Sequence, residues 1–241
     1  MTHSVVVQDL SLNPKTERLR SINLAIKSHE YFGLVGMNGA GKTSLLKSLL
    51  DFCRPELGHI EICGRPSSQV DAREQIAFLP ERFQAPGHLT GERFLRRMMA
   101  LYQLPYEADA ALSLFDQLAL DPAALQLPLG QHSKGMAQKI GLIACLLSKR
   151  SILILDEPMS GLDPYARVKL KELLQQLRRN RTPAPTLILS SHMLGDVESL
   201  CDRIAILHHG KLLFVGTPAD CLQQYSANSL ETAYMNCVTA Q

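Results

Sequence analysis

The sequence contains no tryptophan, and aromatic residues make up only 5% of its 241 residues. Its longest continuous apolar run, residues 140–147, is far shorter than the roughly twenty residues that a membrane-spanning helix requires. The first residues lack a charged segment followed by an apolar stretch, so we expect no signal peptide. Aliphatic residues nevertheless bring the hydrophobic content to 46%, which is enough for a substantial core. We therefore expect a folded cytoplasmic chain with no direct membrane span.

An excess of either charge is also lacking, because the formal net charge is only +2. A balance this small does not indicate nucleic acid as a partner. The basic cluster at 178–181 is interpreted as the solvated end of a helix, where the helix dipole favours cations. The six cysteines form no C-x-x-C pair and no metal-binding spacing with histidine. They predict free thiols in a reducing compartment rather than a disulfide framework or a zinc site.

What the sequence does contain is a phosphate-binding loop at residues 36–44, Gly-Met-Asn-Gly-Ala-Gly-Lys-Thr-Ser. The apolar segment 31–35 before it predicts a buried strand and segment 42–50 predicts a helix, which is the context that this motif requires. Glycines let backbone amides approach an anion at the helix N-terminus. Lys42 can reach the β- and γ-phosphates, and the Thr43 hydroxyl can coordinate Mg²⁺. The motif predicts that the chain binds a nucleoside triphosphate through Gly36, Asn38, Gly39, Ala40, Gly41, Lys42, Thr43 and Ser44.

Strands and helices alternate along the rest of the chain, with no internal repeat. Apolar patterning predicts strands at 5–10, 21–26, 76–79, 151–155 and 186–189. It also predicts a hairpin-like element at 58–64 and a final hairpin of two strands at 203–207 and 212–215. Helical spacing runs from Thr90, as N-cap, to about Leu147 and is broken at Pro105 and at 121–130. A further helix is expected at 164–179, and the tail after Gly216 is expected to be helical or loose. This order predicts an α/β fold with a mainly parallel sheet and a helical insertion.

Two acids, Asp156 and Glu157, stand at the C-terminal end of the apolar strand 151–155. Ligands of open α/β sheets bind at that edge. A buried acid is costly unless it meets a cation, so Asp156 is predicted to hold Mg²⁺ through water or together with Thr43. Glu157 points elsewhere and can orient or deprotonate the water that attacks the γ-phosphate. A helix N-terminus that needs acids explains one of these carboxylates, but not the pair combined with a phosphate loop.

Three further motifs follow in an order that resembles the ATP-binding subunits of ABC transporters, over residues 5–215. The segment 132–138, His-Ser-Lys-Gly-Met-Ala-Gln, is similar to the family signature, 160–163 resembles the D-loop, and 191–192 resembles the switch histidine. The Ser-Lys-Gly-Met version is similar to that of ABC-2 type exporters, as are 216–218 and 229–234, more weakly. The resemblance implies a P-loop NTPase fold with a mainly parallel RecA-like core, an antiparallel β subdomain and a helical subdomain insertion. It implies one ABC ATPase domain, with core and β subdomain at 1–89 and 148–220, helical subdomain at 90–147, and a C-terminal tail at 221–241.

The resemblance also implies how the site works. A hydroxyl and a glycine at a helix start give a second cradle for the γ-phosphate, and in this family that cradle faces the phosphate loop of the other subunit. ATP is then sandwiched between two subunits and drives their dimerisation, as a homodimer or a heterodimer. The catalytic residues implied are Glu157, His192 and Lys42. Nucleotide contacts are further implied for Glu81, Ser133, Lys134, Gly135, Met136 and Asp163, and metal contacts for Thr43, Asp156 and Glu81. The implied protein is an ATPase that powers export through integral membrane permease subunits, on the cytoplasmic face of the inner membrane.

Several positions depart from the family pattern. The segment 10–14 has no aromatic residue to stack on adenine, although Leu12 or Pro14 could supply apolar contact. Glu81 stands in place of the Q-loop glutamine, and Met136 replaces the signature glutamine. Lys134 replaces the first signature glycine, and it either faces the nucleotide or is solvated. These departures motivate an alternative function, a regulatory or structural nucleotide-binding module that hardly hydrolyses ATP. An ABC ATPase that works on DNA or ribosomes is disfavoured by the short helical insertion and the near-neutral charge.

Overall fold

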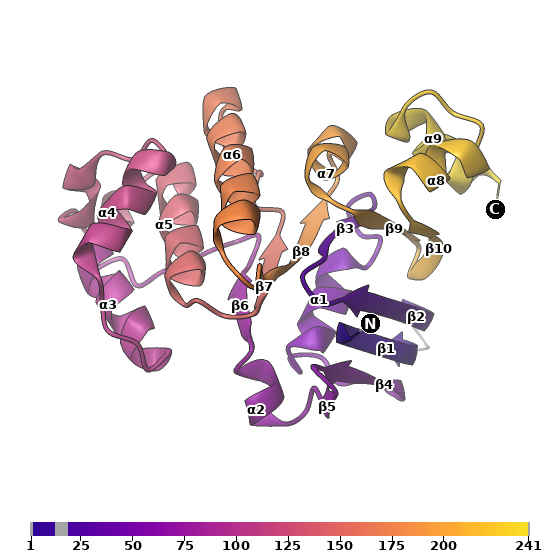
Figure 1. The fold of residues 1–241 in the computed structure, drawn as a ribbon, viewed down its shortest axis with the longest axis horizontal. Coiled ribbons are helices and arrows are strands. Elements are labelled where there is room, and N and C mark those ends of the chain that lie inside the picture. The colour runs from indigo at the N-terminus through magenta and orange to yellow at the C-terminus, as the bar shows by residue number, and fades with distance from the viewer. Residues whose placement is uncertain (1, 13–18, 241) are drawn as a thin grey trace.

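The computed structural model describes residues 2–12 and 19–240, which build two sheets and the helices around them (Figure 1). The larger sheet has six strands in the order β10-β9-β3-β8-β7-β6. All its neighbouring pairs are parallel except β9 and β10, which form the predicted hairpin. The predicted, mainly parallel α/β sheet is therefore confirmed. Its strands are β3 (Tyr31–Val35), β6 (Ile76–Leu79), β7 (Ile152–Asp156), β8 (Thr186–Ser191), β9 (Arg203–His208) and β10 (Lys211–Gly216).

The smaller sheet is antiparallel and has the strand order β2-β1-β4-β5. Helix α1 (Lys42–Leu49) lies between this sheet and the larger one, because Leu45 and Leu46 belong to a buried cluster that contains side chains of both sheets. The segment at 58–64, predicted as hairpin-like, forms β4 and the turn to β5. The strands are β1 (His3–Leu12), β2 (Leu19–Lys27), β4 (Leu57–Ile62) and β5 (Arg65–Pro66).

The strands of the larger sheet are covered on both faces. In β3, Phe32 and Leu34 join the cluster around α1, whereas Tyr31 and Val35 join the cluster on the opposite face. Successive side chains of a strand point to opposite faces, so both sets are buried only if both faces are covered. This arrangement explains why the segments 31–35 and 151–155 are continuously apolar rather than alternating.

The helical segment lies at one end of the molecule, between β6 and β7 in the chain (Figure 1). Thr90 caps α3, since its hydroxyl accepts a hydrogen bond from the Arg93 N–H. The predicted breaks are present: α3 ends before Pro105, and two short 3₁₀ turns occupy most of 121–130. The elements are α3 (Gly91–Leu101), α4 (Ala108–Gln117), η1 (Pro122–Leu125), η2 (Leu129–Gln131) and α5 (Lys134–Leu147).

The chain ends in two helices that pack beside β10, at the opposite end from α3 and α4 (Figure 1). Thr217 and Asp220 form a capping box at the start of the first, and Ser229 caps the second. No helix in the ranges 2–12 and 19–240 is long and apolar enough to cross a membrane. The remaining helices are α2 (Val70–Arg73), α6 (Pro164–Asn180), α7 (Leu194–Leu200), α8 (Pro218–Gln224) and α9 (Leu230–Thr239).

The basic residues at the end of α6 make more contacts with the rest of the protein than expected. Arg178 lies in the last turn, as predicted, but it pairs with Asp202 at 2.8 Å and lies over the Tyr31 ring. Arg181 donates a hydrogen bond of 3.0 Å to the Arg150 carbonyl. These arginines therefore fasten α6 to its neighbours instead of only being solvated.

Candidate nucleotide-binding site

The phosphate loop connects the end of β3 to the start of α1, and its glycines have different roles. Gly39 and Gly41 have φ values of 84° and 109°, in the left-handed region that other residues adopt only with strain. A Cβ on Gly36 would lie 2.4 Å from the Leu207 carbonyl oxygen in β9. Gly36 therefore brings the loop close to the sheet, whereas Gly39 and Gly41 shape the loop itself.

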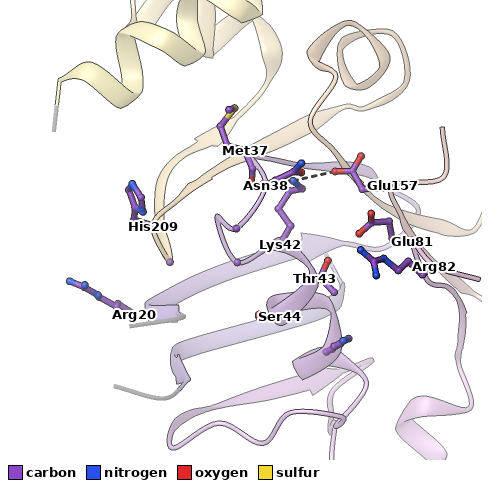
Figure 2. A pocket seen from close by; sticks show the side chains of 14 residues that line it. Arg20, Met37, Asn38, Lys42, Thr43, Ser44, Glu81, Arg82, Glu157 and His209 are labelled. Atoms are coloured by element: carbon purple, nitrogen blue, oxygen red, sulfur yellow. Dashed lines mark hydrogen bonds and ion pairs between the residues drawn. The ribbon is translucent and has the colours of Figure 1, made fainter. Parts of the chain in front are cut away.

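The loop borders a cavity of about 710 Å³ (Figure 2). This volume lies in the range of about 300–1,000 Å³ that is typical of small-molecule sites. Of the residues predicted for the site, Asn38, Gly39, Gly41, Lys42, Thr43, Ser44, Glu81 and Glu157 line the cavity. The lining also includes Arg20, Met37, Lys47, Arg82, His209 and Gly210, which the sequence did not single out.

One of these missed residues had a local signal, because Lys47 follows Thr43 by four residues and therefore shares its face of α1. Arg20, His209 and Gly210 come from β2 and the β9–β10 turn, and only tertiary packing brings them to the loop. Gly210 donates to the Ala40 carbonyl at 3.0 Å and accepts from the Arg20 N–H at 2.8 Å. Figure 2 shows Arg20 and His209 on one side of Lys42 and Glu157 on the other.

The two residues considered for contact with the base are not brought to the cavity lining. Leu12 is 6% exposed and belongs to the buried cluster around α1, so the expectation that it supplies apolar contact is not met. Pro14 lies outside the described residues.

The Lys42 side chain folds back onto its own loop. Its Nζ donates to the Gly36 carbonyl at 2.6 Å and to the Met37 carbonyl at 3.4 Å, and it lies 3.2 Å from Glu157 Oε1. Both side chains of the Lys42–Glu157 pair are less than a tenth exposed. Within the described ranges, Glu157 Oε1 accepts no hydrogen bond, so this ion pair leaves acceptor capacity unused at the edge of the cavity.

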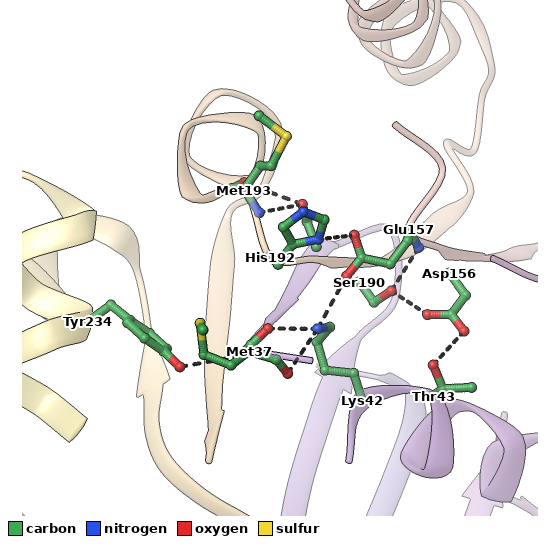
Figure 3. A network of polar contacts seen from close by, with 11 residues as sticks. Met37, Lys42, Thr43, Asp156, Glu157, Ser190, His192, Met193 and Tyr234 are labelled. Carbon is green, nitrogen blue, oxygen red and sulfur yellow. Dashed lines mark hydrogen bonds and ion pairs between the residues drawn. The ribbon is translucent and has the colours of Figure 1, made fainter. Parts of the chain in front are cut away.

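Asp156 is held by two hydroxyl groups. Thr43 Oγ1 donates to Asp156 Oδ2 at 2.9 Å, and Ser190 Oγ donates to Oδ1 at 2.5 Å (Figure 3). Burial raises the pKa of the Asp156 carboxyl above its ordinary value, although these two hydrogen bonds lower it in part. Nearby Glu157 and Glu81 raise it further. A cation at this carboxylate would relieve the cost of its burial.

Glu157 turns away from Asp156 although the two are neighbours in the chain. Its φ is +49°, and its N–H donates to Ser190 Oγ at 2.9 Å. Its Oε2 lies 2.8 Å from His192 Nδ1, at the end of β8 (Figure 3). Ser190 therefore connects both acids, because Asp156 and Ser190 are partners in the β7–β8 register. Lys42 and His192 meet the two oxygens of one carboxylate.

The signature-like segment lies elsewhere. Ser133 caps α5 through a 3.2 Å hydrogen bond from the Met136 N–H, and both Ser133 and Lys134 are exposed. A Cβ on Gly135 would lie 3.4 Å from the Gly161 carbonyl oxygen, so the start of α5 faces the segment 160–163. None of the residues 133–136 is among the described residues that line the cavity.

Asp163, predicted as a nucleotide contact, caps α6 by accepting the Ala166 N–H at 2.9 Å. This hydrogen bond lowers the pKa of the Asp163 carboxyl. Like residues 133–136, Asp163 is absent from the described lining of the cavity. One chain thus brings together the phosphate loop, Glu81, Glu157 and, through hydrogen bonds, Asp156 and His192, but it does not add the α5 N-terminus.

Comparisons with known proteins identify the family and the fold. A family model described as ABC transporter matches residues 19–160, more than half of the chain. An uncharacterized ABC transporter ATP-binding protein of Synechocystis is 37% identical over 214 residues, which are 88% of this chain and 60% of that protein. The Nod factor export ATP-binding protein I of Burkholderia orbicola is 31% identical over 204 residues, 83% of this chain and 66% of that protein. The chain therefore spans less than two thirds of the length of these relatives.

A solved structure described as an ATP binding subunit of an ABC transporter is similar with a TM-score of 0.86 and 30% identity. The likeness covers 97% of this chain and 99% of that one, and so includes nearly every element described above.

Proposed function

Because the chain belongs to the ABC transporter family and has the P-loop fold of its ATP-binding subunits, we propose that it hydrolyses ATP to drive a membrane transporter. One observation carries the proposal. Lys42 and Thr43 of the phosphate loop meet Asp156, Glu157 and, through Glu157, His192 in one polar network beside the cavity. This brings a phosphate cradle and two carboxylates to the C-terminal edge of a parallel sheet, which is where phosphoryl-transfer sites form.

The oxygen donors beside the loop fit Mg²⁺. The Thr43 hydroxyl and the Asp156 carboxylate are hard donors that lie 2.9 Å apart, and Glu81 lines the same cavity. No described residue forms an ion pair with Asp156, so its buried charge lacks a cation. We propose that Thr43, Asp156 and Glu81 hold the metal. A bound Mg²⁺ would neutralise negative charge on the phosphates.

The other groups act on ATP and water. A bound triphosphate offers the Lys42 ammonium charged partners in place of the Gly36 carbonyl and Glu157. Glu157 Oε1 then has its acceptor capacity available to orient the attacking water and to accept its proton. His192 holds Oε2 of the same carboxylate and, being 46% exposed, can also contact the γ-phosphate.

The α5 N-terminus supports a dimer. Residues 133–136 offer a helix N-terminus for an anion but are not among the described residues that line their own chain's cavity. We propose that Ser133, Lys134, Gly135 and Met136, with Asp163, complete the cavity of a second subunit. ATP bound between the two would hold them together, in a homodimer or a heterodimer.

The partner in the membrane would be an integral permease, contacted by the helical subdomain at 90–147 and the loop at Glu81. Likeness to a protein named for Nod factor export supports an exporter, of ABC-2 type by its signature. The chain would then lie on the cytoplasmic face of the membrane through the permease. The core with its β subdomain would comprise 1–89 and 148–220, and 221–241 the tail.

Light scattering of Glu157→Gln protein on a sizing column, with and without ATP and Mg²⁺, tests this proposal. The substitution keeps the shape of the side chain but removes the carboxylate that handles water. We expect a monomer without nucleotide and a dimer with ATP and Mg²⁺. In the matched double variant that adds Ser133→Asp, ATP should no longer give a dimer, because Asp keeps the α5 cap but repels the phosphate.

Phosphate release by the wild type, compared with Lys42→Ala, separates the ATPase from the alternative module. Hydrolysis well above the Lys42→Ala control supports the ATPase, and equal rates favour the regulatory or structural module. A Glu157→Gln chain that binds ATP but stays monomeric contradicts the homodimer and indicates a heterodimer or a required permease.

A further inference from the structure

A hydroxyl group from the C-terminal helix α9 contacts the phosphate loop across 197 residues of sequence. The Met37 N–H donates to Tyr234 Oη at 3.3 Å, while Lys42 Nζ donates to the Gly36 carbonyl at 2.6 Å (Figure 3). The Gly36 C=O and the Met37 N–H belong to the same planar peptide group. This peptide is therefore held on one side by the catalytic lysine and on the other by Tyr234.

Tyr234 is itself fixed in place. It is 7% exposed, and together with Leu230, Ala233 and Cys237 it forms the buried face of α9. These side chains belong to the same buried cluster as side chains of α7 and β10, against which α9 packs. The helix begins at the Ser229 cap. The hydroxyl thus reaches the loop from a rigid frame that does not belong to the phosphate-binding motif.

The two holds on the peptide differ in what ATP does to them. When its ammonium turns to the phosphates, Lys42 leaves the Gly36 carbonyl. The hydrogen bond from Lys42 to the loop is therefore lost at the moment when the loop must hold the phosphates. Met37 is 63% exposed, so water competes for its backbone groups once they are released. A flip of the 36–37 peptide would exchange the positions of its C=O and N–H and would disturb the loop that carries the phosphate-binding amides.

We propose that Tyr234 is a positioning residue for nucleotide binding, which keeps the 36–37 peptide in place after Lys42 has moved; this role rests on the proposed function. The loss of one neutral hydrogen bond should weaken ATP binding by about fivefold, which corresponds to about 1 kcal/mol. The catalytic groups stay in place, so the rate at saturating ATP should change by less than about twofold. If the hydroxyl were needed only for folding, its removal would instead lower the thermal stability and the fraction of active protein.

The experiment compares Tyr234→Phe with Tyr225→Phe in the full chain. The first variant keeps the buried ring and removes the hydroxyl. The second removes a hydroxyl from the same helical pair. That hydroxyl accepts from Gln224 at 3.3 Å and also interacts with Cys237, and no hydrogen bond found in the described residues joins it to the loop. The measurements are the affinity for ATP with Mg²⁺ by calorimetry, KM and kcat, the thermal midpoint without nucleotide, and hydrogen exchange of the Met37 amide.

We expect Tyr234→Phe to raise the ATP dissociation constant and KM by about fivefold at an unchanged kcat. The Met37 amide should exchange about fivefold faster in Tyr234→Phe, and Tyr225→Phe should match the wild type in both measurements. Unchanged ATP affinity in Tyr234→Phe, or equal losses in both variants, overturns the role of Tyr234. If the wild type binds no ATP, the proposed function fails by itself, and the Met37 exchange rate still shows whether Tyr234 holds the loop.

Discussion

Removal of the Ser190 hydroxyl should destabilise the candidate site, although Ser190 is not among the residues assigned to contact the nucleotide. It is fully buried, donates to Asp156 Oδ1 at 2.5 Å and accepts the Glu157 N–H at 2.9 Å. In Ser190→Ala, a hydrogen bond to a carboxylate is lost, which costs about 1.5–3 kcal/mol. The buried Glu157 N–H also loses its partner, which costs about 1–3 kcal/mol. Even at the low end of both ranges, the free energy of unfolding should fall by about 2.5 kcal/mol.

Thermal and urea unfolding of the nucleotide-free protein measure this loss. For a chain of this length, each kcal/mol lowers the melting temperature by about 2–4 °C, so a fall of at least about 5–10 °C is expected for Ser190→Ala. The urea midpoint should fall while the slope of the transition stays the same, because the surface exposed on unfolding does not change.

Ser191→Ala is the matched control, on the same strand. The Ser191 hydroxyl is buried too, but its 2.9 Å bond goes to the N–H of the half-exposed Met193, which water can satisfy. The loss here should be about 1 kcal/mol, or about 2–4 °C. Equal shifts for Ser190→Ala and Ser191→Ala would refute the reasoning, because they would show that neither the Asp156 carboxylate nor the Glu157 N–H depends on Ser190.

Two further predictions concern packing and thiols. Gly36→Ala should destabilise the fold by about 1–3 kcal/mol, because the added methyl would lie 2.4 Å from a backbone oxygen in β9. Gly195→Ala in α7 is the control, because the described residues leave the added methyl in open space there, and it should raise the free energy of unfolding by up to about 1 kcal/mol. Chemical denaturation of both variants measures these changes. An unchanged stability of Gly36→Ala would contradict the packing role of Gly36. Burial raises the pKa of the Cys145 thiol to about 12, so at pH 8 almost no thiolate is present there. Brief alkylation should label exposed Cys63 instead, although partial burial raises its pKa as well, and peptide mapping that finds Cys145 labelled equally fast would contradict the buried position.

The features that the sequence predicted well are those whose signal is local. The phosphate loop lies within nine consecutive residues, and the apolar strand before Asp156 marks where the strand ends. The cap at Thr90 is also readable within three or four residues. Each of these signals lies within a short stretch of sequence, so it can be recognised without knowing which strands and helices become neighbours.

The contacts that sequence reasoning missed depend on which strands and helices become neighbours. Ser190 meets Asp156 because β7 and β8 pair in one register, and a single sequence does not reveal that register. Tyr234 meets Met37 because α9 packs beside β10. Leu12 was considered for the base because of its place after the first strand, but its neighbours in the smaller sheet bury it. In each case the long-range packing, rather than the residue type, decides the role.

The Lys42–Glu157 ion pair stabilises the arrangement of the site without nucleotide. A buried ion pair adds little net stability, but separating its partners is costly unless each finds a new one. A triphosphate provides a new partner for Lys42 only if its charge reaches the loop, and Glu157 is then left with His192 at 2.8 Å. In the proposed mechanism, the carboxylate would be released toward water by the same event that places the γ-phosphate beside it. If Glu157 is the base, as we propose, its carboxylate becomes available only when the phosphate bond that it helps to break is present.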